Sequence, residues 1–191
     1  MITTESFARP EPGDPWTLTD LRWLPDDDLR YEILDGNLVM SPMQAMPHYR
    51  AATLLWETLR AQQPDDVVAV QRVGIAIDRH PRRTTLLVAD LTVIRLSALD
   101  GDDVALTPPD VIAVVEILAP DSGSYEAVVK HHHYARAGIR HYWIVDPKRR
   151  TLTVLRHDGA AGYEEVEVVK PGTTWRTDDP FPLALDPADF T

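Results

Sequence analysis

Two long apolar segments of the chain are each interrupted by one carboxylate, and this pattern restricts the fold more than any other feature. Residues 84–96 read TTLLVADLTVIRL and residues 110–118 read DVIAVVEIL, which places Asp90 and Glu116 inside apolar runs. Near-continuous runs rich in β-branched residues are typical of central strands covered on both faces. Burying an ionised carboxylate there is costly unless a cation, a metal or a proton compensates its charge.

Strand-like and helix-like segments alternate along the rest of the chain. The patterns predict a short helix in residues 17–24, a hairpin at Asp35-Gly36, a helix over 44–63, a strand over 67–77, a helix over 124–137 ended by Gly138, and strands in 140–146, 151–157 and 162–169. This order predicts an α/β (α+β) domain in which a mixed β-sheet is flanked by helices.

Length and composition predict one domain. The chain has 191 residues with 44% hydrophobic content, enough for a single core of ordinary size. Residues 1–15 are rich in proline and polar residues, so we expect a flexible N-terminal tail and a single domain over 16–191.

The charge balance limits the classes of partner. Nineteen Lys and Arg against 30 Asp and Glu give a net charge of -11, which repels nucleic acid at long range. Contact with a phosphate backbone therefore needs a local basic patch or bound divalent cations. The absence of cysteine excludes disulfides, thiolate metal sites and thiol catalysis. Since no signal peptide and no apolar stretch of about 20 residues is found, we expect a cytoplasmic protein without a membrane segment.

The two buried carboxylates permit two interpretations. If residues 84–96 form one strand, alternation places Asp90 in an apolar row, as Glu116 lies in its own row. Two such carboxylates on adjacent strands repel each other unless a divalent cation lies between them, and Mg²⁺ prefers such oxygen ligands and suits phosphate substrates. Neutralising Asp90 is then expected to raise the stability of the metal-free protein. Alternatively, each carboxylate pairs with an arginine such as Arg72 or Arg95.

Lys130 is the candidate cation beside this pair. It follows Glu116 by a turn and half a predicted helix, so its ammonium can fold back over the strand. A lysine at that place can orient a water molecule and offset charge at a phosphorane-like transition state. The alternative is an ordinary solvated lysine on the helix surface.

Several longer motifs resemble one family. They are "RYEILDGNLVMSPMQAMPHYRAATLL", "VADLTVI", "VVEILAP" and, most specific of all, "EAVVKHHHYARAGIRHYWIVDP". In these motifs the chain resembles the putative restriction endonuclease family, a bacterial branch of the PD-(D/E)XK nuclease superfamily. The resemblance extends from about Trp16 to Asp158.

The resemblance implies a restriction-endonuclease-like fold and a metal-dependent endonuclease that hydrolyses phosphodiester bonds, with Mg²⁺ (or Mn²⁺) as cofactor and DNA as the expected partner. It implies that Asp90 and Glu116 hold the metal and that Glu32 completes the acidic site. Lys130 would replace the lysine that usually follows the glutamate by two residues, where this chain has Leu118. The chain also departs from the family pattern at Ala89 and at two further positions, Ala119 and Glu126.

The remaining candidates each have a structural and a functional interpretation. His48 matches the family's helix histidine and either approaches the site or makes a structural hydrogen bond. Glu126 lies four residues before Lys130 and either forms a surface ion pair or orients the lysine. The run His131–His133 cannot converge on one ion, because consecutive helix residues diverge by about 100°. Tyr134, Tyr142 and Trp143 are expected in the core.

A second class of function remains open from the sequence. The chain is then a non-catalytic binding or assembly module that keeps the nuclease fold. A homodimer is also expected, because several β segments follow the catalytic core and because duplex cleavage calls for two symmetric sites.

Overall fold

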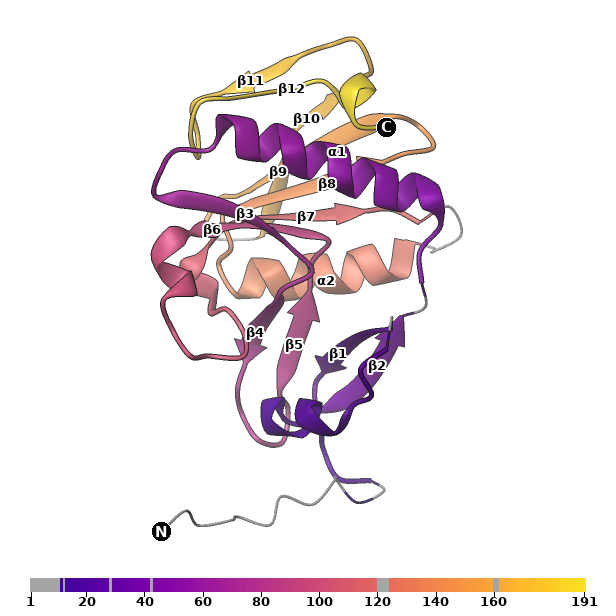
Figure 1. Cartoon of the computed structure of the whole chain (residues 1–191), viewed down its shortest axis with the longest axis vertical. Helices are drawn as coiled ribbons and strands as arrows, with labels where there is room; N and C mark the ends of the chain where they lie inside the picture. The colour runs from indigo at the N-terminus through magenta and orange to yellow at the C-terminus, as the bar shows by residue number, and fades with distance from the viewer. Residues whose placement is uncertain (1–10, 12, 28, 42, 120–123, 160–161) are drawn as a thin grey trace.

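The structure is a computed structural model that describes residues 11, 13–27, 29–41, 43–119, 124–159 and 162–191 (Figure 1). Most of the tail expected over residues 1–15 lies outside the described residues, as does the side chain of Glu126.

Two α-helices, twelve strands and four 3₁₀ helices are found in the described part of the chain. They are η1 (Leu18–Trp23), β1 (Arg30–Leu34), β2 (Asn37–Ser41), α1 (Met46–Gln62), β3 (Val67–Gln71), β4 (Gly74–Asp78), β5 (Thr85–Val88), β6 (Leu91–Arg95), η2 (Leu96–Leu99), η3 (Pro108–Asp110), β7 (Val111–Ile117), α2 (Ser124–Arg136), β8 (His141–Asp146), β9 (Thr151–His157), β10 (Tyr163–Val169), β11 (Trp175–Thr177), β12 (Leu183–Leu185) and η4 (Pro187–Asp189). The predicted mixed α+β class is confirmed.

The strands form three sheets. The largest has the order β10-β9-β8-β7-β6-β3, with β7 and β8 parallel and the other neighbours antiparallel. A four-stranded antiparallel sheet has the order β2-β1-β5-β4, and β11 pairs with β12. The apolar run predicted to be a central strand is β7, inside the largest sheet, where its residues are almost all buried.

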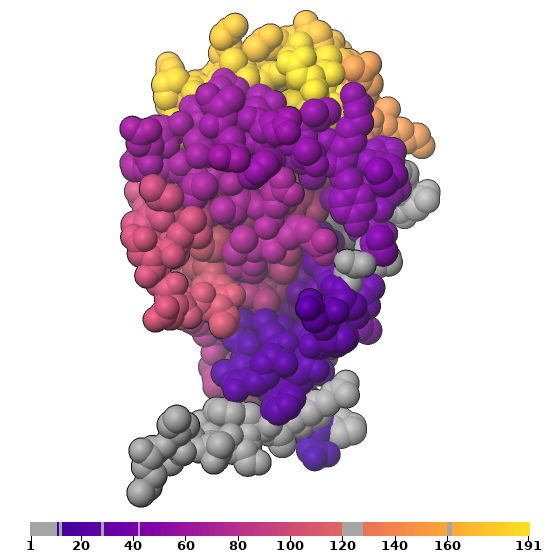
Figure 2. Space-filling view, in the orientation of Figure 1, coloured from indigo at the N-terminus to yellow at the C-terminus, as the bar shows by residue number. Residues whose placement is uncertain are grey.

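The largest sheet has a core on each side. One core joins the buried stripe of α1, which includes Leu55 and Leu59, to strand residues such as Val115 and Trp143. The other core contains Tyr134 of α2 together with Val114 and Tyr142. The helices therefore cover opposite faces of the sheet, as the predicted architecture requires (Figure 1). Figure 2 shows the N-terminal hairpin and the C-terminal strands at opposite ends of the molecule.

Two segments expected to be single strands are each divided between two sheets. Residues 67–77 form β3 in the largest sheet and β4 in the four-stranded sheet, and residues 84–96 form β5 and β6 in the same way. The chain changes direction at Arg72, whose φ is 54°, and at Ala89-Asp90. The expectation that Asp90 lies in an apolar row of one continuous strand is therefore wrong. The apolar run is continuous because strands in both sheets are buried.

The C-terminal hairpin β11-β12 was not expected from the sequence, because each strand has three residues and the intervening segment contains Pro180 and Pro182. It contacts the end of α1 through Gln62, which bonds both the N–H and the carbonyl of Ala184. No helix in the described residues is long and apolar enough to cross a membrane.

Candidate active site

The candidate site lies where the chain crosses between the two larger sheets. Asp90 stands between the end of β5 and the start of β6. Leu91 pairs with Val115 in the antiparallel register of β6 and β7, and one further step along both strands places Asp90 beside Glu116. The two carboxylates that interrupt the apolar runs are therefore neighbours, as the sequence predicts, with Glu116 on β7 and Asp90 directly before β6.

Lys130 reaches this point from the middle of α2. Its Nζ lies 3.2 Å from Glu116 Oε1 and 3.0 Å from Glu32 Oε1, and it donates a 2.9 Å hydrogen bond to the carbonyl of Val88. The residue is only 2% exposed. The interpretation of a solvated surface lysine is wrong, and the buried ammonium contacts two acidic side chains at once.

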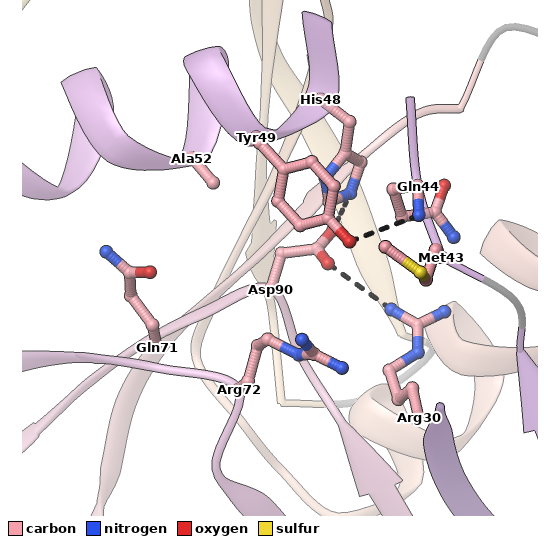
Figure 3. Close-up of a pocket in the computed structure, with 9 residues that line it drawn as sticks. All are labelled: Arg30, Met43, Gln44, His48, Tyr49, Ala52, Gln71, Arg72 and Asp90. Carbon is pink, nitrogen blue, oxygen red and sulfur yellow. Dashed lines mark hydrogen bonds and ion pairs between the residues drawn. The ribbon is translucent and has the colours of Figure 1, made fainter. Parts of the chain in front are cut away.

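Asp90 is held by three donors from separate elements. Arg30 Nη1 of β1 lies 3.3 Å from Oδ1, and His48 Nε2 of α1 lies 3.1 Å from Oδ2 (Figure 3). The backbone N–H of Ile117 donates to Oδ2 at 2.7 Å. The ion-pair interpretation therefore predicted the right kind of partner for Asp90, an arginine, but the wrong residues. The arginine that pairs with Asp90 is Arg30, not Arg72 or Arg95.

The other two carboxylates are also anchored. Glu32 of β1 accepts a 2.6 Å hydrogen bond from the N–H of Val88, and its Oε2 lies 3.8 Å from Arg30 Nε. Glu116 accepts a 2.9 Å hydrogen bond from the hydroxyl of Tyr134 on α2. Glu32, Asp90, Glu116 and Lys130 thus form one buried network with neighbouring donors.

The environment of Asp90 favours its charged form. Burial by itself raises the pKa of this carboxyl, but the hydrogen bonds and charges of His48, the N–H of Ile117 and the charge of Arg30 together hold the pKa below its usual value. The repulsion expected from the sequence is therefore outweighed at Asp90. We therefore expect neutralisation of Asp90 to destabilise the metal-free protein, which is the opposite of the sequence-based expectation.

Glu116 has the opposite character. Burial raises the pKa of its carboxyl to about 8, although Lys130 lowers it, and Asp90 and Glu32 add to the rise. Burial also opposes the charge of Lys130, but Glu116 and Glu32 raise the pKa of the ammonium above its usual value. Since Glu32 stays beside the ammonium when Glu116 is protonated, Lys130 remains charged near neutral pH.

This raised pKa predicts a pH-dependent stability. The folded protein binds a proton at Glu116 more tightly than the unfolded chain does, so its stability falls as pH rises toward 8. Between pH 7 and 8 we expect the free energy of unfolding of the metal-free protein to fall by about 1 kcal/mol. The pKa values of three histidines are lowered by burial, so these residues titrate below this pH interval. They are His131, His133 and His141.

Urea unfolding at pH 7 and pH 8, with a chelator present, measures this effect. Glu116→Gln is the control, because it removes the titrating carboxyl and keeps the size of the side chain. The same fall in both proteins would show that another group is responsible.

Comparisons with known proteins show the family of the chain and support its fold. The family Uma2, described as "Putative restriction endonuclease", matches residues 18–188, most of the chain. The chain belongs to this family. A solved structure, described as a putative nuclease belonging to DUF820 from Anabaena variabilis, is similar with a TM-score of 0.69. It is 19% identical, and the match covers 92% of this chain and 97% of that one, so it supports the fold. No curated protein matches the chain.

The acidic side chains at the site of this Uma2 family member suit a divalent cation in their chemistry. Asp90 and Glu116 lie side by side. Burial and the neighbouring carboxylates raise the pKa of Glu116, so a further cation beside it would favour its ionised form. Hard carboxylate oxygens are what Mg²⁺ and Mn²⁺ bind. Within the described residues, however, no three His, Asp or Glu side chains are already arranged to hold a metal ion. Binding therefore requires the contacts of Lys130 and Arg30 to rearrange.

Three contacts that build the site were left open by the sequence or were not predicted from it. His48 makes a direct bond to Asp90, so it does approach the site. Arg30 was not predicted, although strand alternation places it on the same face as Glu32 two residues later. Tyr134 is buried in the core as expected, but its hydroxyl donates to Glu116. The spacing of four residues between Lys130 and Tyr134 on one helix was the available signal.

The three consecutive histidines do not join the site. The His131 ring packs edge-on against Tyr163 and Tyr142, with centroid distances of 5.1 and 5.9 Å. His132 is exposed, and its ring lies 5.8 Å from that of His133. This agrees with a helix face that has one packed imidazole.

Proposed function

We propose that the chain is a Mg²⁺-dependent phosphodiesterase (Mn²⁺ being an equivalent cofactor), an endonuclease that acts on DNA. Glu32, Asp90 and Glu116 would hold the metal, and Lys130 would act on the reacting phosphate. The observation that carries the proposal is the position of Lys130 Nζ, within 3.2 Å of both Glu116 and Glu32. Lys130 thus places a cation beside Glu116, although the residue two positions after Glu116 in the chain is Leu118 and not a lysine.

The raised pKa of Lys130 determines its proposed role. An ammonium that stays protonated cannot remove a proton from water, so general-base catalysis is not assigned to it. Its fixed positive charge instead stabilises the negative charge that develops on the phosphate oxygens in the transition state. A bound divalent cation supplies Lewis-acid stabilisation and a water molecule of lowered pKa. Arg30 and His48 keep Asp90 ionised and oriented.

A nucleic-acid substrate is supported by the family and by the chemistry of the site. The family description names endonucleases, and an acidic site with a buried lysine is suited to a phosphodiester. The charge of -11 opposes long-range attraction of DNA, so binding energy must come from local contacts.

A second candidate function is a binding or assembly module without catalysis. The specific observation that favours it is that all three carboxylates already accept hydrogen bonds or ion pairs from protein groups. A network compensated in this way can be stable with no metal at all.

Cleavage distinguishes the two functions. We expect purified protein with Mg²⁺ to nick a supercoiled plasmid or cut a labelled oligonucleotide, and expect a chelator to stop the reaction. A folded protein that cuts neither DNA with Mg²⁺ or Mn²⁺ supports the module.

The homodimer, the cytoplasmic location and the single domain over 16–191 remain predictions. Light scattering at micromolar concentration tests the first: a monomer would remove the case for two symmetric sites.

A further inference from the structure

Arg72 lies at the second crossing between the sheets, directly beside Asp90. It connects β3 to β4, and its backbone N–H donates a 3.2 Å hydrogen bond to the carbonyl of Asp90. Its φ of 54° falls in the left-handed region, which is uncommon for a residue with a large side chain and occurs preferentially at functional sites. The backbone of Arg72 is thus tied to the candidate catalytic aspartate.

The Arg72 side chain borders two cavities and carries an uncompensated charge. One is a cavity of about 40 Å³ next to Asp90 and His48, and the other is an open groove of about 410 Å³. Arg72 is exposed, and among the described residues its guanidinium forms no ion pair. Figure 3 shows the side chains of Arg72 and Arg30 both below Asp90 in the view. Arg30 already forms ion pairs with Asp90 and Glu32. We therefore consider the guanidinium of Arg72 as the group that can pair with a bound anion.

The groove combines apolar and aromatic side chains with charged ones. Its walls are Leu21, Leu24, Pro25, Leu29, Tyr31 and Val88, with Asp26, Arg30 and Arg72 as its charged members. Its volume lies within the usual range of small-molecule pockets, roughly 300 to 1,000 Å³. A nucleobase fits this chemistry: its faces contact apolar and aromatic side chains, and its sugar-linked phosphate can reach an arginine.

The charge of the whole chain favours a single strand over a duplex. Duplex DNA has the higher charge density and depends more on neutralisation by many cations, which a protein of net charge -11 lacks. A base inside the groove must also be unpaired. Apolar contact with one base and one arginine on its phosphate provides local binding energy without a broad basic surface.

We propose that Arg72 binds a phosphate next to the scissile bond of single-stranded DNA and that the groove takes the adjoining unpaired base. This inference rests on the proposed nuclease function and specifies its substrate. It also removes the need for two symmetric sites, which was the duplex-based reason to expect a dimer.

Fluorescence anisotropy with a labelled 12-nucleotide single strand and the matched duplex tests the proposal, in Ca²⁺ and over a series of salt concentrations. We expect the native protein to bind the single strand more tightly than the duplex. Arg72→Gln should weaken single-strand binding about tenfold and reduce the slope of log K against log salt by about 0.7. Leu24→Asn should weaken binding about fivefold or more with an unchanged slope, because a base contact carries no counterion.

Arg95→Gln is the matched control, since Arg95 is also exposed but lies at the far end of β6, and this variant should bind like the native protein. Melting temperatures verify that each variant is folded. Cleavage of the same strand in Mg²⁺ is measured in parallel. If the native protein cuts DNA while Arg72→Gln binds and cuts equally well, or if the duplex binds as tightly, this proposal fails and the nuclease function stands. If the native protein neither binds nor cuts, both fail.

Discussion

Lys130→Met is expected to lower the free energy of unfolding of the metal-free protein at pH 7 by about 3 kcal/mol or more, because it leaves the carboxylate of Glu32 buried without the ammonium that it contacts and removes the same contact from Glu116. The same change should reduce the cleavage rate by about a hundredfold or more, the scale of one lost electrostatic group at the reacting centre. Urea unfolding and initial rates of nicking measure the two effects. Methionine keeps an apolar stem of similar length, so packing is largely preserved.

Lys148→Met is the control for this variant. Lys148 is exposed in the turn after β8, and its removal should change stability by less than about 0.5 kcal/mol. If Lys130→Met cleaves DNA as fast as the native protein, the assigned role of Lys130 in catalysis is wrong. Its structural role is then judged by the unfolding data alone.

Asp90→Asn should abolish cleavage and destabilise the metal-free protein by about 2 to 3 kcal/mol. The amide loses the charge that Arg30 and His48 favour, and its NH₂ group must face a donor where Oδ1 or Oδ2 now accepts. Thermal unfolding in a chelator and nicking in Mg²⁺ measure these effects. Asp103→Asn, at an exposed site, controls for removal of a surface aspartate.

The sign of the stability change is informative. A higher melting temperature for Asp90→Asn would mean that carboxylate repulsion dominates, as the sequence alone predicted. It would contradict the lowered pKa of Asp90 and the three donors that explain it.

The sequence predicted the fold class and most elements because their signals are local. Asp35-Gly36 identifies the β1-β2 hairpin, and both residues have positive φ angles there. Gly138, with a φ of 72°, ends the turn after α2 as expected. The division of residues 67–77 and 84–96 between two sheets was not predictable, because hydrophobicity does not show which strand a segment pairs with. That division positions both Arg72 and Asp90.

The candidate site was predicted in its acidic members but not in their partners. Asp90 and Glu116 interrupt apolar runs, which is a strong local signal, and Lys130 follows on the next helix. The bonds of Arg30 and His48 to Asp90 depend on how β1 and α1 pack against the junction of the sheets, and spacing does not encode that packing. Tyr134 was expected in the core, and its ring is buried there. Its hydroxyl is the part of the side chain that joins the network, through its hydrogen bond to Glu116.

Calorimetric titration of the native protein with Mn²⁺ tests most directly whether the buried acidic pair is a metal site. We expect saturable binding that is weakened at least tenfold by Asp90→Asn and by Glu116→Gln, with Asp103→Asn binding like the native protein. Saturable binding that neither substitution changes, or the absence of binding to the folded native protein, would contradict the assignment of Asp90 and Glu116 as ligands.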